Sequence, residues 1–389
     1  MASRLLTRSF VFAFLSQMLM GLSFALFVHF AAFLVELGAD EVRIGLVIGV
    51  GSIGSLILRP FVGVLMDRIG RRPLIHAGNI INVLSAGLYL TVDSLSWWVY
   101  ALTIVHGMAE AVLFTALATY GADIIPEDRR TEGLALFGVS GQLPIALGGL
   151  IGDFVLRIGD FELFFIVATG FATLALIAAL PLREAKRQTR PTGGFMQAVA
   201  RRSLQPIWLV SGGFAVAMIS YFVFLTTYVD ATGVGSVGAF FAVYSGTAIT
   251  LRILGARLPQ RVGELRLLTA SMAGMVVGLS VLAIAPGDIL FLGAAILTGA
   301  AHGYAFPILY SLVVTRTPVE DRGAALSGFL SFFPLASLLA APVMGWLIDL
   351  GGYTMMYASV AGFVALATAG FVWAETRRPH QLAYVSEAR

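Results

Sequence analysis

Apolar stretches of about 20 residues recur along almost the entire chain, and they limit its fold more than any other feature. A helix of that length crosses the hydrocarbon core of a bilayer, which is roughly 30 Å thick. The chain is 58% hydrophobic and 12% charged, whereas soluble proteins carry about 25% charged residues. We therefore expect an all-α integral membrane protein with twelve transmembrane helices. Their predicted spans are 10–35, 43–66, 74–92, 97–122, 133–154, 162–182, 205–229, 237–256, 267–285, 289–314, 324–348 and 354–374.

The positions of Arg and Lys predict how these helices are oriented. Most of the 25 basic residues fall in segments on the same side as the N terminus, and only Arg43 and Arg157 fall in loops on the other side. Because cytoplasmic loops carry the excess of Arg and Lys, we expect both termini in the cytoplasm and a location in the plasma membrane, the inner membrane of a bacterium. These arginines also account for the net charge of +3, so no nucleic-acid partner is expected.

The two halves of the chain repeat each other. With a shift of 193 positions, similar residues coincide in pairs: Gly45 with Gly238, Ser52 with Ser245, Arg59 with Arg252, and Gly70 with Gly263. Duplicated halves are common among membrane transporters. We predict an N-terminal six-helix bundle at 1–182 and a C-terminal six-helix bundle with a short cytoplasmic tail at 205–389. The basic segment 183–204 contains Pro and a Gly pair, which indicates a cytoplasmic linker.

The loop between the second and third predicted helices carries charges and glycines at a distinctive spacing. Its sequence GVLMDRIGRR fits the pattern G-x-x-x-D-R-x-G-R-R. With the twelve spans, the two halves and the basic linker, it resembles the major facilitator superfamily of secondary transporters, in particular the twelve-helix drug and metabolite efflux branch. The resemblance covers the whole chain and implies two pseudo-symmetric bundles that work by alternating access. The matching residues are Gly63, Asp67, Arg68, Gly70, Arg71 and Arg72.

Individual residues of this loop have expected roles. Gly63 allows a neighbouring helix to approach closely, and Gly70 permits a tight turn. We expect the Asp67 carboxylate to face the positive end of the eleventh helix and to be held by Arg71. In the family such a cluster latches the two halves on the cytoplasmic side, together with an acid at the end of the fourth helix, here Asp123. The alternative is that these charges only fix the topology.

The second copy of the loop has different charges. Gln260 stands at the position of Asp67, and Glu264 at that of Arg71. Arg316 stands at the position of Asp123. A second latch should therefore be weaker or differently connected. Arg59 and Arg252 lie about two turns inside their helices, where structural pairing is favoured over contact with a substrate.

Ionisable residues near mid-membrane indicate a coupling site. His106 and Glu110 are four residues apart, hence on one face of the fourth helix. A charge at this depth is costly, so such residues usually face a cavity. The resemblance implies that helices 1, 4, 7 and 10 line the central cavity. The further candidates on those helices are His302, Gln17, His29 and Tyr221.

Glu110 is the candidate proton carrier. Burial favours a neutral carboxyl group, whereas water or a protonated His106 favours the carboxylate, so alternating exposure could load and release a proton. The alternative is a structural pair that holds helices together. A cavity rich in Phe with one acid suits a small, moderately hydrophobic organic solute, neutral or cationic.

The fifth predicted helix bears on the direction of transport. Gly148, Gly149, Gly152 and Asp153 resemble the G-P-x-x-G-G element of many exporters in the superfamily, with Gly149 in place of Pro and Asp153 in place of the last Gly. This favours export over import, although small residues also serve close helix packing. The Arg common in the family's fourth helix is absent, and Thr103 stands near its place.

Other classes of protein are disfavoured by the motifs. The sequence has no zinc-binding H-E-x-x-H, no G-x-S-x-G, no nucleotide loop and no cysteine, so neither an enzyme nor a cofactor is expected. A metal-ion transporter is disfavoured because its His and Met residues are scattered. We predict a monomeric, proton-coupled secondary transporter or antiporter, with a small organic substrate, protons and membrane lipid as partners. The open alternatives are an uncoupled facilitator, an importer or a substrate sensor.

Overall fold

The protein folds as a bundle of long membrane helices in the computed structural model. The structure describes residues 5–184, 197, 199–284, 287–318 and 321–377, without the side chains of Asp67, Glu127, Thr131 and Ala135. No strand occurs in these ranges. The helices are α1 Arg8–Leu26, η1 Phe27–His29, α2 Phe30–Glu36, α3 Glu41–Ile69, α4 Arg71–Leu88, η2 Tyr89–Thr91, α5 Trp97–Ile124, η3 Glu127–Arg129, α6 Arg130–Ile158, α7 Phe161–Ala179, α9 Gln205–Thr232, α10 Val237–Leu254, α11 Leu258–Val262, α12 Glu264–Ile284, α13 Asp288–Thr315 and α14 Arg322–Thr376.

Twelve membrane crossings follow from these helices. Eleven of the described helical segments are long and apolar enough to cross a bilayer, and the first of them combines α1, η1 and α2. The last, α14, is two helices joined at Gly351 and Gly352, where Gly352 has a φ of 71°. The break falls between the last two predicted spans. The prediction of twelve transmembrane helices is therefore confirmed.

Local side-chain caps set several of the helix ends. Thr7, Asp40, Asp160 and Ser236 each accept a hydrogen bond from the backbone N–H three residues further on, at the start of α1, α3, α7 and α10. The first free N–H groups of a helix need such partners. The α3–α4 turn depends on Gly70, whose φ of 101° is open to glycine and disfavoured for other residues. The predicted tight turn at Gly70 is confirmed.

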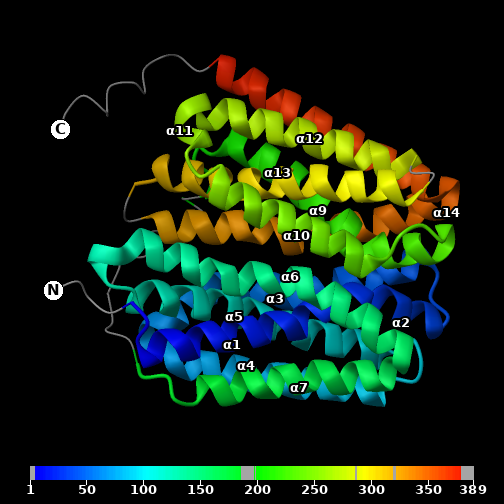
Figure 1. Ribbon diagram of the computed structural model, residues 1–389, viewed down its shortest axis with the longest axis horizontal. Helices are drawn as coiled ribbons and strands as arrows, with labels where there is room; N and C mark the ends of the chain where they lie inside the picture. The colour runs from blue at the N-terminus through cyan, green and yellow to red at the C-terminus, as the bar shows by residue number, and fades with distance from the viewer. Residues whose placement is uncertain (1–4, 185–196, 198, 285–286, 319–320, 378–389) are drawn as a thin grey trace.

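The helices form two halves that lie side by side (Figure 1). Helices α1 to α7 occupy the lower part of the view and α9 to α14 the upper part. Across the boundary, α3 packs against α14 and α6 packs against α10. Glycines permit this approach, because a Cβ on Gly49 would lie 3.1 Å from the Ser337 carbonyl oxygen. The fold is thus the expected pair of pseudo-symmetric six-helix bundles.

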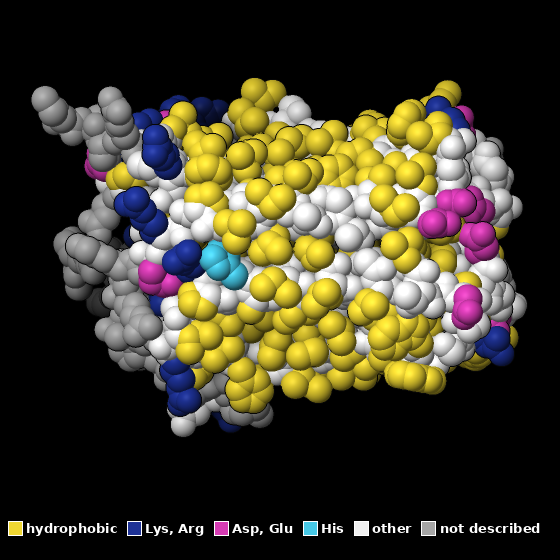
Figure 2. All heavy atoms as spheres, turned by 90° about the horizontal axis from the view of Figure 1, so that it is seen from below, with side chains coloured by type: hydrophobic (Ala, Val, Ile, Leu, Met, Phe, Trp, Pro, Cys, Tyr) yellow, Lys and Arg dark blue, Asp and Glu magenta, His cyan; other side chains and the backbone are white. Residues whose placement is uncertain are grey.

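The surface separates into an apolar band and two charged ends (Figure 2). Arg and Lys side chains gather at one end, and Asp and Glu side chains dominate the other. We call the first the arginine-rich end; it holds the α3–α4 and α5–α6 connections. The second, the acidic end, holds the α2–α3, α6–α7 and α9–α10 connections. Between them the exposed side chains are largely apolar, as contact with lipid requires.

We predict that Gly70→Ala lowers the melting temperature of the protein. The backbone conformation at Gly70 costs other residues roughly 1–3 kcal/mol, and a Cβ there would lie 2.7 Å from the Glu184 carboxyl group. Gly138→Ala is the matched control, because this glycine lies inside α6 and its Cβ would meet no atom within 4 Å. The check is thermal unfolding in detergent followed by Trp fluorescence. Equal melting temperatures for the two variants would contradict the prediction.

Candidate transport site

Glu110 lies in the middle of α5, where it faces an arginine of α3. The guanidinium group of Arg59 is close enough for the two opposite charges to interact, although the described structure shows no direct hydrogen bond between them. Arg59 donates a weak hydrogen bond of 3.4 Å to the Ser55 hydroxyl, and its buried Nε has no acceptor in the described residues. Charges at this depth are costly unless they are compensated. Arg59, expected to pair structurally, is thus the charged neighbour of Glu110.

His106 lies one helical turn before Glu110 but is held by other residues. Its Nδ1 is 3.1 Å from the Ser85 hydroxyl of α4. Its ring stacks on Phe27 at 4.2 Å and lies 4.6 Å from the ring of Phe24. The side chain is buried, and Nε2 has no hydrogen-bond partner among the described residues. His106 is therefore a buried polar group in an aromatic setting, next to Glu110 along the helix.

Two buried asparagines of α4 extend this polar region. Asn79 and Asn82 are fully buried, on the side of α4 where Gly78 meets α5 and Ser85 meets His106. The Asn79 amide donates to the Ile75 carbonyl, whereas neither polar atom of the Asn82 side chain has a partner among the described residues. Sequence analysis missed both. The available signal was the three-residue spacing of Asn79, Asn82 and Ser85 in an apolar helix.

The repeat shows that the fold does not require these polar groups. With the shift of 193 positions, Asn79, Asn82 and Ser85 fall over Met272, Met275 and Gly278 of α12. Both methionines are fully buried. The same packing place is thus polar in one half and apolar in the other. Buried unpaired amides destabilise a protein, so Asn82 lowers the stability of this place relative to Met275.

His302 belongs to a second buried cluster, in the other half. Its Nδ1 shares a hydrogen bond with the Tyr244 hydroxyl, which also lies 3.2 Å from the Tyr221 hydroxyl. All three side chains are buried, and they connect α13, α10 and α9. The structure therefore brings His302 and Tyr221 together, as two of the predicted residues. Tyr244 was missed, and nothing in the sequence distinguishes it from the other tyrosines.

Arg252, the counterpart of Arg59 in the second half, has neutral hydrogen-bond partners and no carboxylate beside it among the described residues. Its Nε donates to the carbonyl oxygen of Gly303 at 3.2 Å. With the Gln142 amide oxygen turned towards it, the guanidinium group also donates to that oxygen at 2.8 and 3.1 Å, which links α10 to α6 of the other half. In the repeat, Arg252 falls over Arg59 and Gly303 over Glu110. Only the first half has a carboxylate at this place.

Gln17 and His29 lie at contacts of the first helix with α6. The Gln17 side chain adjoins Gly141, and its buried Oε1 has no partner among the described residues. His29 instead lies near the acidic end, where Nε2 donates to Asp153 at 2.9 Å. The structure thus does not place His29 beside Glu110. Two glycines of the fifth predicted helix serve the same contacts, because Gly148 packs on α1 and Gly152 on the His29 ring, whereas Gly149 packs on α10.

The arginine-rich end contains part of the predicted gate. Arg71 Nε binds Asp123 Oδ2 at 3.0 Å, in an ion pair that is largely buried. The Glu184 carboxylate, which sequence analysis missed, accepts from the backbone N–H groups of Arg71 and Arg72 at 2.8 and 3.1 Å. Such groups cap the start of α4. The side chain of Asp67 lies outside the described residues, and so does its predicted contact with the eleventh helix.

One expectation about this loop is wrong. Gly63 was expected to admit a closely packed helix, but a Cβ there would meet no atom within 4 Å. The reason is that α3 meets α14 further towards the acidic end, at Gly45 and Gly49. The close approach thus occurs several turns away from Gly63.

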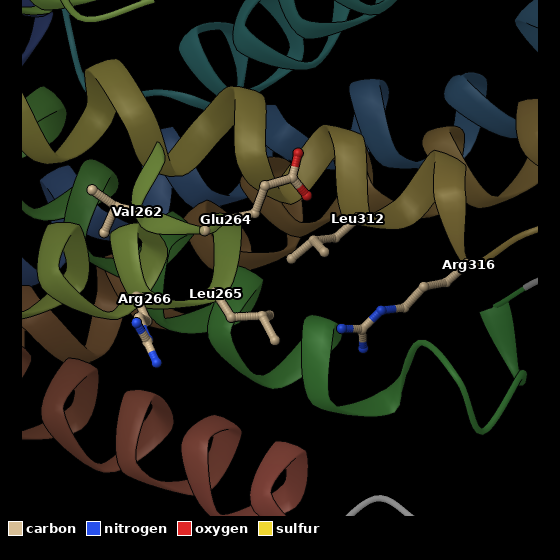
Figure 3. A pocket seen from close by; sticks show the side chains of 7 residues that line it. Val262, Glu264, Leu265, Arg266, Leu312 and Arg316 are labelled. Atoms are coloured by element: carbon tan, nitrogen blue, oxygen red, sulfur yellow. The ribbon is translucent and has the colours of Figure 1, made fainter. Parts of the chain in front are cut away.

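A surface pocket of about 500 Å³ lies at the arginine-rich end of the second half. Its lining includes Glu264, Arg266 and Arg316, at the start of α12 and the end of α13. In Figure 3 the Glu264 carboxylate points away from Arg266, and it accepts from the Ser311 hydroxyl at 3.0 Å. Arg316 pairs with Glu375 through two bonds of 2.8 and 2.9 Å. The pocket is therefore separate from Glu110, which lies mid-span in the other half.

Metal binding finds no support in the described part of the chain, where no group of three His, Asp or Glu side chains could hold an ion. Twelve crossings in two pseudo-symmetric halves, with few ionisable groups inside, are an architecture common among secondary transporters. The family model described as Major Facilitator Superfamily matches residues 13–288 and 233–389. The chain belongs to the major facilitator superfamily and is an integral membrane transporter, not an enzyme.

Similar proteins agree with this assignment. The "Uncharacterized MFS-type transporter YhhS" of Escherichia coli (strain K12) is 23% identical over 391 residues, which cover 97% of this chain and 93% of that protein. A D-xylose-proton symporter structure has a TM-score of 0.76 at 16% identity and covers 94% and 96% of the two chains. The human organic anion transporter MFSD10 (TETRAN) has a TM-score of 0.70 at 19% identity, with 94% and 99% covered. These structures show the shared fold.

We predict that Asn82→Met raises the melting temperature by about 2–4 °C. The substitution copies Met275 of the second half and removes an unpaired buried amide, which costs roughly 1–3 kcal/mol. Asn79→Met is the matched control with a smaller expected gain, because its amide already donates to Ile75. The measurement is thermal unfolding of the purified variants. A lower melting temperature for Asn82→Met would refute the assignment of an unpaired amide.

Proposed function

We propose that the protein is a proton-coupled secondary active transporter of a small, moderately hydrophobic organic solute, with export as its direction. The observation that carries the proposal is Glu110, a carboxyl group in mid-span that faces the charge of Arg59, with no direct bond between the two in the described structure. A carboxyl group held loosely in this way can change its protonation state without loss of the fold. The alternating-access cycle would expose it to each side in turn.

The surroundings of Glu110 support two parts of the proposal: a proton as the coupling ion and a moderately hydrophobic organic solute. Arg59 and entering water favour the carboxylate, whereas exclusion of water favours the neutral acid. Phe24, Phe27 and Tyr89 surround His106 with aromatic surface, which suits an apolar organic group. A structurally similar protein is named a proton symporter, and this supports proton coupling on the same fold.

The direction and the orientation are parts of the same proposal. The Gly148, Gly149 and Gly152 contacts resemble the helix-packing element of exporters. By the bias of basic residues, the arginine-rich end faces the cytoplasm of a bacterial inner membrane, with both termini there. We further propose bundles at 1–182 and 205–389, the linker 183–204 and a functional monomer.

We predict that Glu110→Gln abolishes solute-dependent proton movement. The amide keeps the shape of the side chain but cannot carry a proton. The measurement uses purified protein in liposomes that enclose a pH dye, offered a panel of organic solutes with and without a pH gradient. Glu162→Gln, an exposed acid at the start of α7, is the control and should keep wild-type flux.

Two results would overturn the coupling proposal. Solute flux without proton movement in both wild type and Glu110→Gln would identify a facilitator, with Glu110 and Arg59 as ligand contacts. Solute binding without flux would identify a sensor. Uptake driven by an inward proton gradient, with solute moving the same way as protons, would replace export by import.

A further inference from the structure

Asp153 joins the two halves of the molecule at the acidic end. Its Oδ1 accepts from Nε2 of His29 at 2.9 Å, within the first half. Its Oδ2 accepts from the backbone N–H of Gly238 at 2.8 Å, at the start of α10 in the second half. One carboxylate thus bonds a side chain on one side of the boundary and a helix end on the other.

The bond to Gly238 has the character of a helix cap. Gly238 is the second residue of α10, so its N–H is one of the first donors, which have no partner within the helix. The start of a helix also carries partial positive charge, which favours a carboxylate. Ser236 caps the same helix from within, by accepting from Ala239 at 3.1 Å. Asp153 adds a second cap that comes from the opposite half.

His29 fixes the position of the Asp153 carboxylate. The imidazole ring is buried and lies against Gly152, where a Cβ would be 2.5 Å from Nδ1. The ring of Phe164 packs on it at 6.2 Å, edge to face. The Asp230 carboxyl group of α9 is close enough to His29 and Asp153 to interact with both through charge. The ring therefore has little freedom, and it directs the carboxylate towards α10.

Other bonds close the same end. The Thr226 hydroxyl of α9 donates to the Val28 carbonyl at 2.6 Å. The Tyr353 hydroxyl donates to the Glu41 carboxylate at 2.7 Å. Both bonds cross between the halves, as does the Asp153 bond. All of them must break when the acidic end opens in an alternating-access cycle.

The internal repeat shows that helix packing at this boundary does not depend on the Asp153 bond. Gly238 falls over Gly45, and each of these two glycines lies at a contact between the halves. Gly152 falls over Gly345, which packs against Glu41 of the first half. Asp153 itself falls over Trp346. The equivalent contact of α3 with α14 thus forms with no acid at this place. The acid is an addition to the packing, not a requirement of it.

We propose that Asp153 and His29 are positioning residues of transport. Asp153 holds the acidic end closed by capping α10, and His29 holds Asp153 in place. The bond to Gly238 breaks each time this end opens, and neither residue touches the solute. The inference rests on the alternating-access part of the proposed function and is independent of proton coupling at Glu110.

The test measures opening of the acidic end directly. The chain has no cysteine, so spin labels can be placed on Asp93→Cys and Ile289→Cys alone. These exposed residues lie at the acidic end, in the first and second halves. Double electron–electron resonance then gives the distance distribution between them. Asp153→Ala removes one cap on α10, and this loss should raise the ratio of molecules open at the acidic end to closed molecules about fivefold.

Two further variants and a control complete the design. Asp153→Asn keeps the volume but loses one acceptor, and His29→Phe keeps a ring but loses the donor; both should shift the ratio in the same direction. Asp160→Ala is the matched control, because Asp160 caps α7 within its own half, at 3.0 Å from Leu163 N. It should lower the melting temperature without changing the distance distribution.

The outcomes separate this inference from proton coupling. The proposed role of Asp153 and His29 would be overturned if the distances stay at the wild-type values in folded Asp153→Ala, Asp153→Asn and His29→Phe. An equal opening in Asp160→Ala would also overturn it, because the effect would then be general destabilisation. If the three variants open and the wild-type protein moves solute without protons, the role of Asp153 and His29 stands and the coupling proposal fails.

Discussion

The absence of water inside a bilayer governs this structure. Every backbone N–H and carbonyl group in the membrane needs a partner from the protein, so the described chain is helical throughout its spans. The same condition makes each charged or polar side chain inside the membrane costly. The few that occur are therefore informative. Several of them lie beside a partner that lowers the cost of their burial. The pairs are Arg59 with Glu110, Arg252 with Gln142, and His29 with Asp153.

The two halves share a packing plan and differ in polarity. Equivalent places hold Glu110 and Gly303, Asn82 and Met275, and Asp153 and Trp346. In each of these pairs the first half has the polar member. The second half instead buries a neutral chain of Tyr221, Tyr244 and His302. The carboxyl group on which the proposed proton coupling rests, Glu110, therefore lies in the first half, and its equivalent place in the second half is a glycine.

The sequence predicts the helices well, because each apolar stretch must span the same thickness and is recognised without knowledge of its neighbours. The repeat likewise predicts the two halves and the alignment of Arg59 with Arg252. Contacts between distant segments are different. Asp153 and His29 are 124 positions apart, and only the packing of η1, α6 and α10 brings them to one helix end. Gly63 shows the opposite case, since its motif predicts a contact that the helix forms elsewhere.

The short η1 turn at Phe27–His29 interrupts the first membrane helix next to the boundary between the halves. A regular helix uses its carbonyl oxygens internally, but here the Val28 carbonyl accepts the Thr226 hydroxyl of the other half. That acceptor belongs to the backbone, so every residue type at position 28 would present it. Sequence drift at this position would leave the contact intact, and a comparison of residue types there would fail to reveal that it joins the halves.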